Sequence, residues 1–130
     1  MNNRSPLSRW LAVILWAAVI FALSSIEQIK VSEFFLWDFI VKKTAHVGEY
    51  AILFALIFRA TRKNWVLTFL LTMGYAVTDE YHQSFVPGRS ATFLDLGFDA
   101  SGVNIASYII WKLKPRLTWS RQIHRKKPRK

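Results

Sequence analysis

Four apolar segments dominate this chain and limit the folds that are open to it. They cover residues 10–26, 39–58, 65–85 and 91–111 and are separated by polar connections. A helix needs roughly 20 residues to cross the hydrocarbon core of a bilayer, so each segment is a plausible span, the first a short one. The segments therefore predict an all-α protein, a four-helix transmembrane bundle. A hydrophobic content of 52% beside a net charge of +10 fits such a protein if its basic part lies at the lipid surface.

The basic residues are unevenly distributed over the connections. Fourteen of the 18 Lys and Arg lie in residues 1–9, in the 59–63 connection or from Lys112 onward, and these stretches hold no acid. Because basic loops stay in the cytoplasm, both termini are predicted there (N-in/C-in). The expected parts are a cytoplasmic N-terminus (1–9), a four-helix membrane domain (10–112) and a basic cytoplasmic tail (113–130). The tail is expected to contact anionic lipids, and no nucleic acid is expected as a partner.

The first apolar segment has an alternative interpretation as a secretory signal peptide. Arg4 and Arg9 precede it, and Ala22-Leu23-Ser24 lies near its end, as in a signal sequence with its cleavage site. The long apolar run and the early Trp10 favour a retained membrane helix instead.

Polar residues of the other three segments converge at one depth. In the predicted topology the second segment enters from outside, the third exits there and the fourth re-enters. Charge at the edge of hydrocarbon is costly and usually functional, so we expect a polar site in the outer leaflet. The residues concerned are Lys43, His46, Glu49, Tyr50, Asp79, Glu80, Gln83, Asp95 and Asp99.

The fourth segment carries one stripe of polar and small residues. Asp95, Asp99, Gly102 and Ala106 follow each other at helical spacing. Small residues let two helices approach closely, so this stripe is expected to face the bundle.

A turn is predicted between the third and fourth segments. Proline at position 87 and glycine at position 88 favour a type II turn. Arg89 follows and can reach back over the acids. Structural explanations exist for single residues: Asp95 suits a capping box with Thr92, and Lys42 suits snorkelling to headgroups.

The same residues form a motif that resembles the VanZ-like membrane proteins. The resemblance covers roughly residues 40–106 and implies a small multi-pass protein of the bacterial cytoplasmic membrane and cell envelope. The founding member of that family is associated with low-level resistance to the glycopeptide teicoplanin. The motif reads Lys43-x-x-His46-x-x-Glu49-Tyr50, then Asp79-Glu80-x-x-Gln83-x-Phe85-x-Pro87-Gly88-Arg89, then Asp95 and Gly102. The chain departs from the family pattern at Asp99, where asparagine is usual, and at Ala106, where glycine is frequent.

Three functions remain open at this stage, and binding is favoured. A binding protein would hold a lipid-linked cell-wall precursor or a lipoglycopeptide and change its access, through Lys43, Tyr50, Gln83, Arg89, Asp95 and Asp99. A membrane enzyme would act on an envelope lipid headgroup, with His46, Glu49, Asp79 and Glu80 as catalytic candidates. In a structural module the same network would only fix the four helices.

The charge balance of the site raises the question of a cation. Five carboxylates face two fixed positive charges, Lys43 and Arg89. In a low dielectric they cannot all stay ionised without a cation or protons. A histidine among carboxylates is compatible with a divalent cation, but no compact spacing such as H-E-x-x-H is present. The sequence therefore specifies neither a metal nor its ligands.

Overall fold

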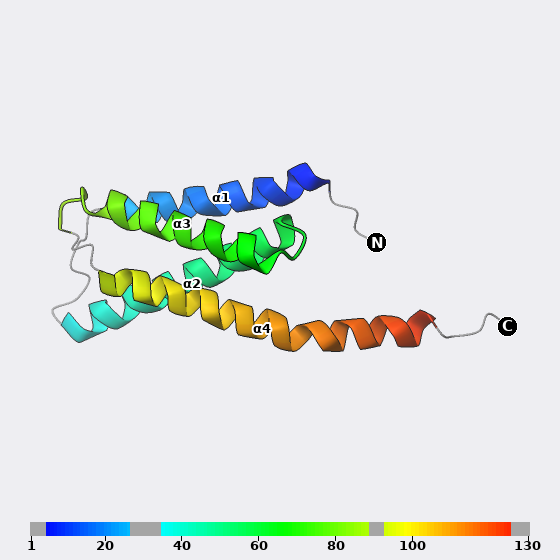
Figure 1. Ribbon diagram of the computed structural model, residues 1–130. Helices are drawn as coiled ribbons and strands as arrows, with labels where there is room; N and C mark the ends of the chain where they lie inside the picture. Colours follow the sequence, from blue (N-terminus) through cyan, green and yellow to red (C-terminus); the bar gives the residue numbers. More distant parts are fainter. Residues whose placement is uncertain (1–4, 27–34, 89–92, 126–130) are drawn as a thin grey trace.

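The described part of the chain folds into four helices. The computed structural model describes residues 5–26, 35–88 and 93–125. Within these ranges the elements are α1 (Pro6–Ser24), α2 (Phe35–Ala60), α3 (Trp65–Gln83) and α4 (Phe93–Arg125), with no strand. The start of α1 and the end of α4 point to the same end of the molecule (Figure 1). The all-α, four-helix prediction is confirmed.

Two helices are longer than the apolar segments that predicted them. α2 begins at Phe35 rather than near residue 39, and α4 runs to Arg125 rather than ending near residue 111. Apolar periodicity marks the part of a helix that is buried, and α4 continues beyond it despite Pro115, through a stretch otherwise rich in Lys, Arg and Leu, which favour helix. The basic tail is therefore helical for much of its length.

α1 is, among the described residues, the one helix that is long and apolar enough to cross a membrane. Its mean hydropathy is 1.9, and only 17% of that stretch is buried inside the protein. An N-terminal signal sequence has a similar composition, so α1 alone does not define a multi-pass protein. The other helices carry the polar residues predicted for the site, and these lower their hydropathy.

Local sequence signals place the helix ends. The Ser5 side chain accepts a bond from the backbone N–H of Ser8 at 3.3 Å and caps α1, and Asn64 caps α3 in the same way. Between α2 and α3, Arg62 and Lys63 have φ of 56° and 71°. The N–H of Lys63 donates to the carbonyl of Phe58 at 2.9 Å, which closes α2 with a left-handed turn. This tight connection makes α2 and α3 neighbours.

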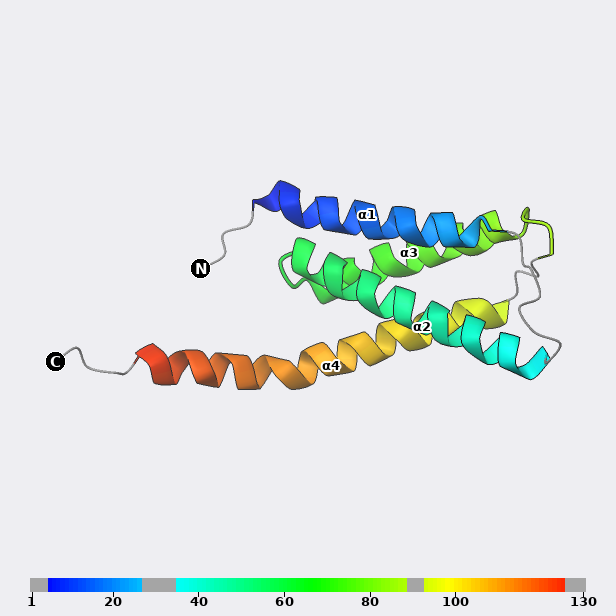
Figure 2. The ribbon, with the colours of Figure 1, turned by 180° about the vertical axis from the view of Figure 1, so that it is seen from behind.

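α2 is the central helix of the bundle. It packs against each of the other three helices, and Figure 2 shows it running obliquely between α1 and α4. Its buried residues divide between two apolar clusters. The first joins α1, α2 and α3 through Val13, Ile20, Tyr50, Leu53, Ile57, Ala60 and Ala76, and the second joins α2 and α4 through Phe54, Phe58, Val103 and Ala106.

α2 and α4 approach most closely at Gly102. A Cβ atom on Gly102 would lie 2.3 Å from the carbonyl oxygen of Val47 and 3.2 Å from the backbone nitrogen of Ala51. Gly102 and Ala106 are both buried. The predicted small-residue contact surface is thus present, and its partner is the backbone of α2.

α1 is attached to the bundle by side chains that bind main-chain carbonyls. The indole nitrogen of Trp16 donates to the carbonyl of Glu49 at 3.0 Å. In the opposite direction, the Tyr75 hydroxyl of α3 donates to the carbonyl of Ala17 at 2.6 Å. These bonds attach α1 to α2 and α3.

Candidate functional site

Polar side chains from all four helices meet at the end of the bundle where α1 and α3 finish and α4 begins (Figure 1). We call this set the polar cluster. It contains Ser24, Lys43, His46, Tyr50, Asp79, Glu80, Gln83, Asp95 and Asp99. The cluster divides into two groups and one ion pair.

The first group surrounds Asp79 on α3. Its Oδ1 accepts a 2.5 Å bond from the Ser24 hydroxyl of α1. Its Oδ2 accepts from the Tyr50 hydroxyl at 3.1 Å and from the amide nitrogen of Gln83 at 2.8 Å. The same Gln83 nitrogen also donates to Ser24 at 3.1 Å. Asp79 is 3% exposed, and its two oxygens are occupied by donors from three helices, so this group connects α1, α2 and α3.

The second group, His46, Glu80 and Asp99, lies beside the first. The Nδ1 atom of His46 lies 3.0 Å from Oδ1 of Asp99. Glu80 approaches from α3, and one ligand atom from each of the three residues lies within 4.8 Å of the others. The rings of His46 and Tyr50 are nearly parallel, with centroids 6.5 Å apart. The two groups are therefore adjacent, but the first is built around Asp79 and the second contains Glu80 and Asp99.

An ion pair joins α2 to α4 at the outer rim of the cluster. Lys43 pairs with Asp95, and the lysine nitrogen also lies 5.5 Å from the ring centre of Phe39 and 5.4 Å from that of Phe98. Two aromatic faces favour a cation at this position. Asp95 thus serves the α2–α4 contact, while its predicted capping partner Thr92 lies outside the described residues.

Three carboxylate oxygens of the cluster are buried without a hydrogen-bond partner among the described residues. They are both side-chain oxygens of Glu80 and Oδ2 of Asp99. Asp99 is fully buried, with 0% of its surface exposed. An unsatisfied buried polar group is costly, more so if it is charged, so these atoms indicate a place for a polar ligand or an ion.

The predicted site residues meet with few exceptions. Glu49 is half-buried, and its backbone carbonyl binds Trp16, but it is not part of the His46 group. Arg89 lies outside the described residues, so its predicted contact with the acids stays a prediction. Gly88 has the φ of 77° that the predicted type II turn requires at this position.

Ser24 is the residue of the polar cluster that the sequence did not reveal. It lies at the end of an apolar helix, where Ala22-Leu23-Ser24 suggested only a signal-peptide cleavage site. A polar residue near the end of an otherwise apolar helix, at the depth of the other polar groups, is the signal that could have found it. His82 lies apart from the cluster: its ring stacks on Phe21 with centroids 4.4 Å apart.

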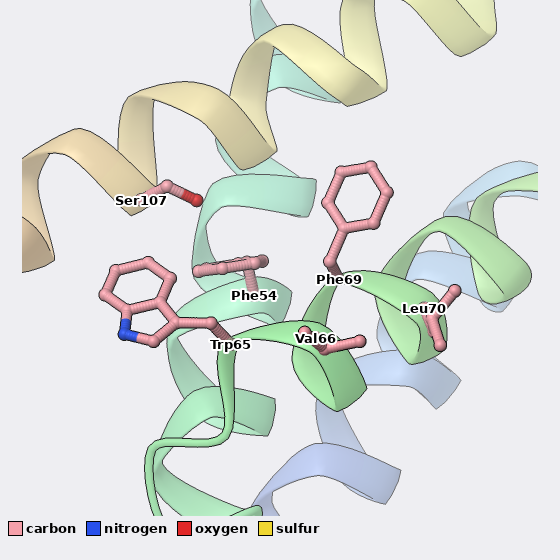
Figure 3. Close-up of a pocket in the computed structure, with 6 residues that line it drawn as sticks. All are labelled: Phe54, Trp65, Val66, Phe69, Leu70 and Ser107. Atoms are coloured by element: carbon pink, nitrogen blue, oxygen red, sulfur yellow. The ribbon is translucent and has the colours of Figure 1, made fainter.

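An apolar pocket of about 340 Å³ lies elsewhere in the bundle. Figure 3 shows it between α3 and α4, with side chains from α2, α3 and α4 around it. Its lining residues are Phe54, Trp65, Val66, Phe69, Leu70 and Ser107. It shares no residue with the polar cluster and offers no titratable group, so it is not the candidate site.

The fold and the site together define a small helical bundle whose one end is built from a histidine, a lysine and several carboxylates. The family model described as VanZ/LLP1 matches residues 8–115. The chain belongs to the VanZ/LLP1 family, which confirms the VanZ-like resemblance and associates the chain with membranes. No curated protein and no solved structure matches the chain.

Proposed function

We propose that all four helices of the chain span the bacterial cytoplasmic membrane, with both termini in the cytoplasm. The apolar outer surface of the bundle supports this. One large aliphatic side chain on each helix, Ile14, Ile40, Leu70 and Ile109, is between 49% and 61% exposed, and many others are exposed beside them. Exposed apolar surface of this extent is unusual for a soluble monomer. If the basic stretches face the cytoplasm, as such stretches usually do, the polar cluster lies on the outer side.

Reporter fusions test this topology. Fusions after Lys63 and Lys130 should report the cytoplasm, and an insertion in the Pro87–Gly88 turn should report the outside. An external signal at Lys130 would invert the bundle and move the polar cluster to the inner leaflet.

The polar cluster, in this proposal, binds the headgroup of a lipid-linked cell-wall precursor or of a lipoglycopeptide at the outer leaflet and changes its access. The observation that carries the proposal is the set of buried carboxylate oxygens without partners, on Glu80 and Asp99, at the end of an apolar bundle; these oxygens can accept hydrogen bonds from the hydroxyl and amide groups of a headgroup. A purely structural network would satisfy its buried groups. Lys43, which is 19% exposed in its side chain, is placed at the rim to meet an anionic headgroup.

Binding of a defined probe tests this role. Purified protein in detergent is titrated with geranylgeranyl pyrophosphate, with geranylgeraniol as the probe without a phosphate and teicoplanin as the lipoglycopeptide. Lys43→Met should weaken pyrophosphate binding at least tenfold, while Lys42→Met should bind as the parent does. Equal binding of the alcohol and the pyrophosphate, with no binding of teicoplanin, would refute the headgroup site.

A membrane enzyme is the second candidate, favoured by the contact between His46 and Asp99. A carboxylate beside one ring nitrogen orients an imidazole and stabilises its charged form, an arrangement used by general bases. Glu80 supplies a second acid within reach. Release of phosphate from the pyrophosphate probe, lost in His46→Gln with binding retained, would establish catalysis. If the parent protein binds the pyrophosphate probe but releases no phosphate, the enzyme candidate is refuted and the binding role is supported.

A further inference from the structure

We propose that His46, Glu80 and Asp99 form a binding site for one divalent transition-metal ion of the Mn²⁺ or Zn²⁺ class. The three side chains come from α2, α3 and α4, so the site exists only in the folded bundle. Each offers one ligand atom, and these atoms lie within 4.8 Å of one another.

The separations in this group fit a common ion. With bonds of about 2.1 Å, adjacent ligands of an octahedral ion lie about 3.0 Å apart and opposite ligands about 4.2 Å apart. The His46 Nδ1 and Asp99 Oδ1 atoms are 3.0 Å apart, which is a hydrogen-bond distance and also the spacing of adjacent ligands, so an ion here would replace the proton that the two atoms share. The remaining separations, of up to 4.8 Å, need to close by only about 0.6 Å, which small side-chain rotations allow.

Unpaired oxygens supply a second, independent reason. Oδ2 of Asp99 belongs to a side chain with no exposed surface. Together with both side-chain oxygens of Glu80, it has no hydrogen-bond donor among the described residues. Two neighbouring carboxylates in a buried place repel one another unless protons or a cation intervene. One divalent ion bound between the two carboxylates would offset this repulsion and give Glu80 a partner.

Asp79 and Asp95, the other two buried acids, do not compete for this role. Both oxygens of Asp79 already accept bonds from Ser24, Tyr50 and Gln83, and Asp95 pairs with Lys43. The ligand set is therefore one imidazole and two carboxylates. Imidazole selects transition ions over Mg²⁺ and Ca²⁺, which prefer oxygen ligands. Three protein ligands also leave coordination positions of the ion open for water or a phosphate oxygen. Coordination of a phosphate oxygen rests on the proposed headgroup binding.

Metal titration of the full chain in detergent tests the site without any lipid probe. Protein freed of metal with a chelator is titrated with Mn²⁺, and the spectrum of the free ion is followed by electron paramagnetic resonance. We expect one Mn²⁺ per chain, displaced by Zn²⁺ and not by equal Mg²⁺. His46→Gln and Glu80→Gln should each weaken binding at least tenfold, and His82→Gln is the matched control that should bind as the parent does.

Asp99→Asn is a further variant that removes a ligand charge, and it tests the site even if His46→Gln or Glu80→Gln fails to fold. Asparagine has nearly the same size and shape as aspartate, so the bundle should tolerate it, and circular dichroism checks each variant. Equal Mn²⁺ binding by the parent, His46→Gln and Asp99→Asn would overturn the site, as would equal loss in His82→Gln. If the parent protein binds no Mn²⁺ but still binds the pyrophosphate probe in the presence of chelator, the metal site is refuted. The proposed headgroup binding is then still supported.

Discussion

Replacing Gly102 with alanine should separate the two helices that pack most closely. The added Cβ would lie 2.3 Å from the Val47 carbonyl oxygen, whereas real Cβ atoms keep at least 3.0 Å from such neighbours. The obstacle is the backbone of α2, which cannot rotate away as a side chain could. α4 must therefore move outward by at least about 0.7 Å at Gly102, the difference between the two distances, which loosens the packing of Val103 and Ala106.

The magnitude follows from a comparison with Gly97→Ala on the same helix. Gly97 has no atom within 4 Å of its would-be Cβ, so that variant should gain up to about 1 kcal/mol from helix propensity alone. Gly102→Ala has the same gain but also the overpacking, which costs about 1–3 kcal/mol. The difference between the variants isolates the close contact and corresponds to a melting temperature lower by roughly 4–12 °C.

Thermal melting of both purified variants in the same detergent, followed by circular dichroism, measures this difference. If Gly102→Ala melts at or above the temperature of Gly97→Ala, the α2–α4 approach is looser than described. The convergence of the polar cluster, which depends on that approach, would then be wrong as well.

Three further predictions concern the charges of the cluster, each checked by melting of the purified variant. Asp79→Asn should lose about 1–3 kcal/mol of stability, because an amide NH₂ would face donors from its neighbours, and a melt equal to the parent's would contradict this. Lys43→Met should lose about 1–3 kcal/mol by leaving Asp95 without this partner, whereas Lys42→Met should change stability by less than about 0.5 kcal/mol. Arg89→Ala should be more harmful than Lys42→Ala, by about 3–5 kcal/mol if its pair is fully buried, and Arg89→Lys should rescue only in part. If Arg89→Ala melts like the parent both with and without divalent ions, Arg89 lies in solvent and this prediction is wrong.

The sequence predicted the helices of the fold better than it predicted which residues of the polar cluster contact one another. Apolar segments and a small-residue stripe were enough to predict four helices and the α2–α4 contact, because burial and close packing leave a regular pattern. The convergence of His46, Asp79 and Asp99 at one end followed from chain direction alone.

The separate roles of Asp79 and Glu80 could not be predicted in this way. Adjacent residues on a helix point about 100° apart, and which of the two meets a given neighbour depends on the rotation of α3 in the bundle. That rotation is set by packing partners such as Ala76, buried against α1 and α2. The part played by Ser24 was missed for the same reason, since it depends on how α1 docks.

The attachment of α1 through main-chain carbonyls has a consequence for how this fold tolerates sequence change. Trp16 binds the carbonyl of Glu49, and Tyr75 binds the carbonyl of Ala17. Every residue has such a carbonyl, so the accepting positions are free to vary while the bonds persist. Only the two aromatic donors are constrained. Correlated substitutions between the donor and acceptor positions are therefore not expected across the VanZ/LLP1 family, even though the helices are in direct contact there.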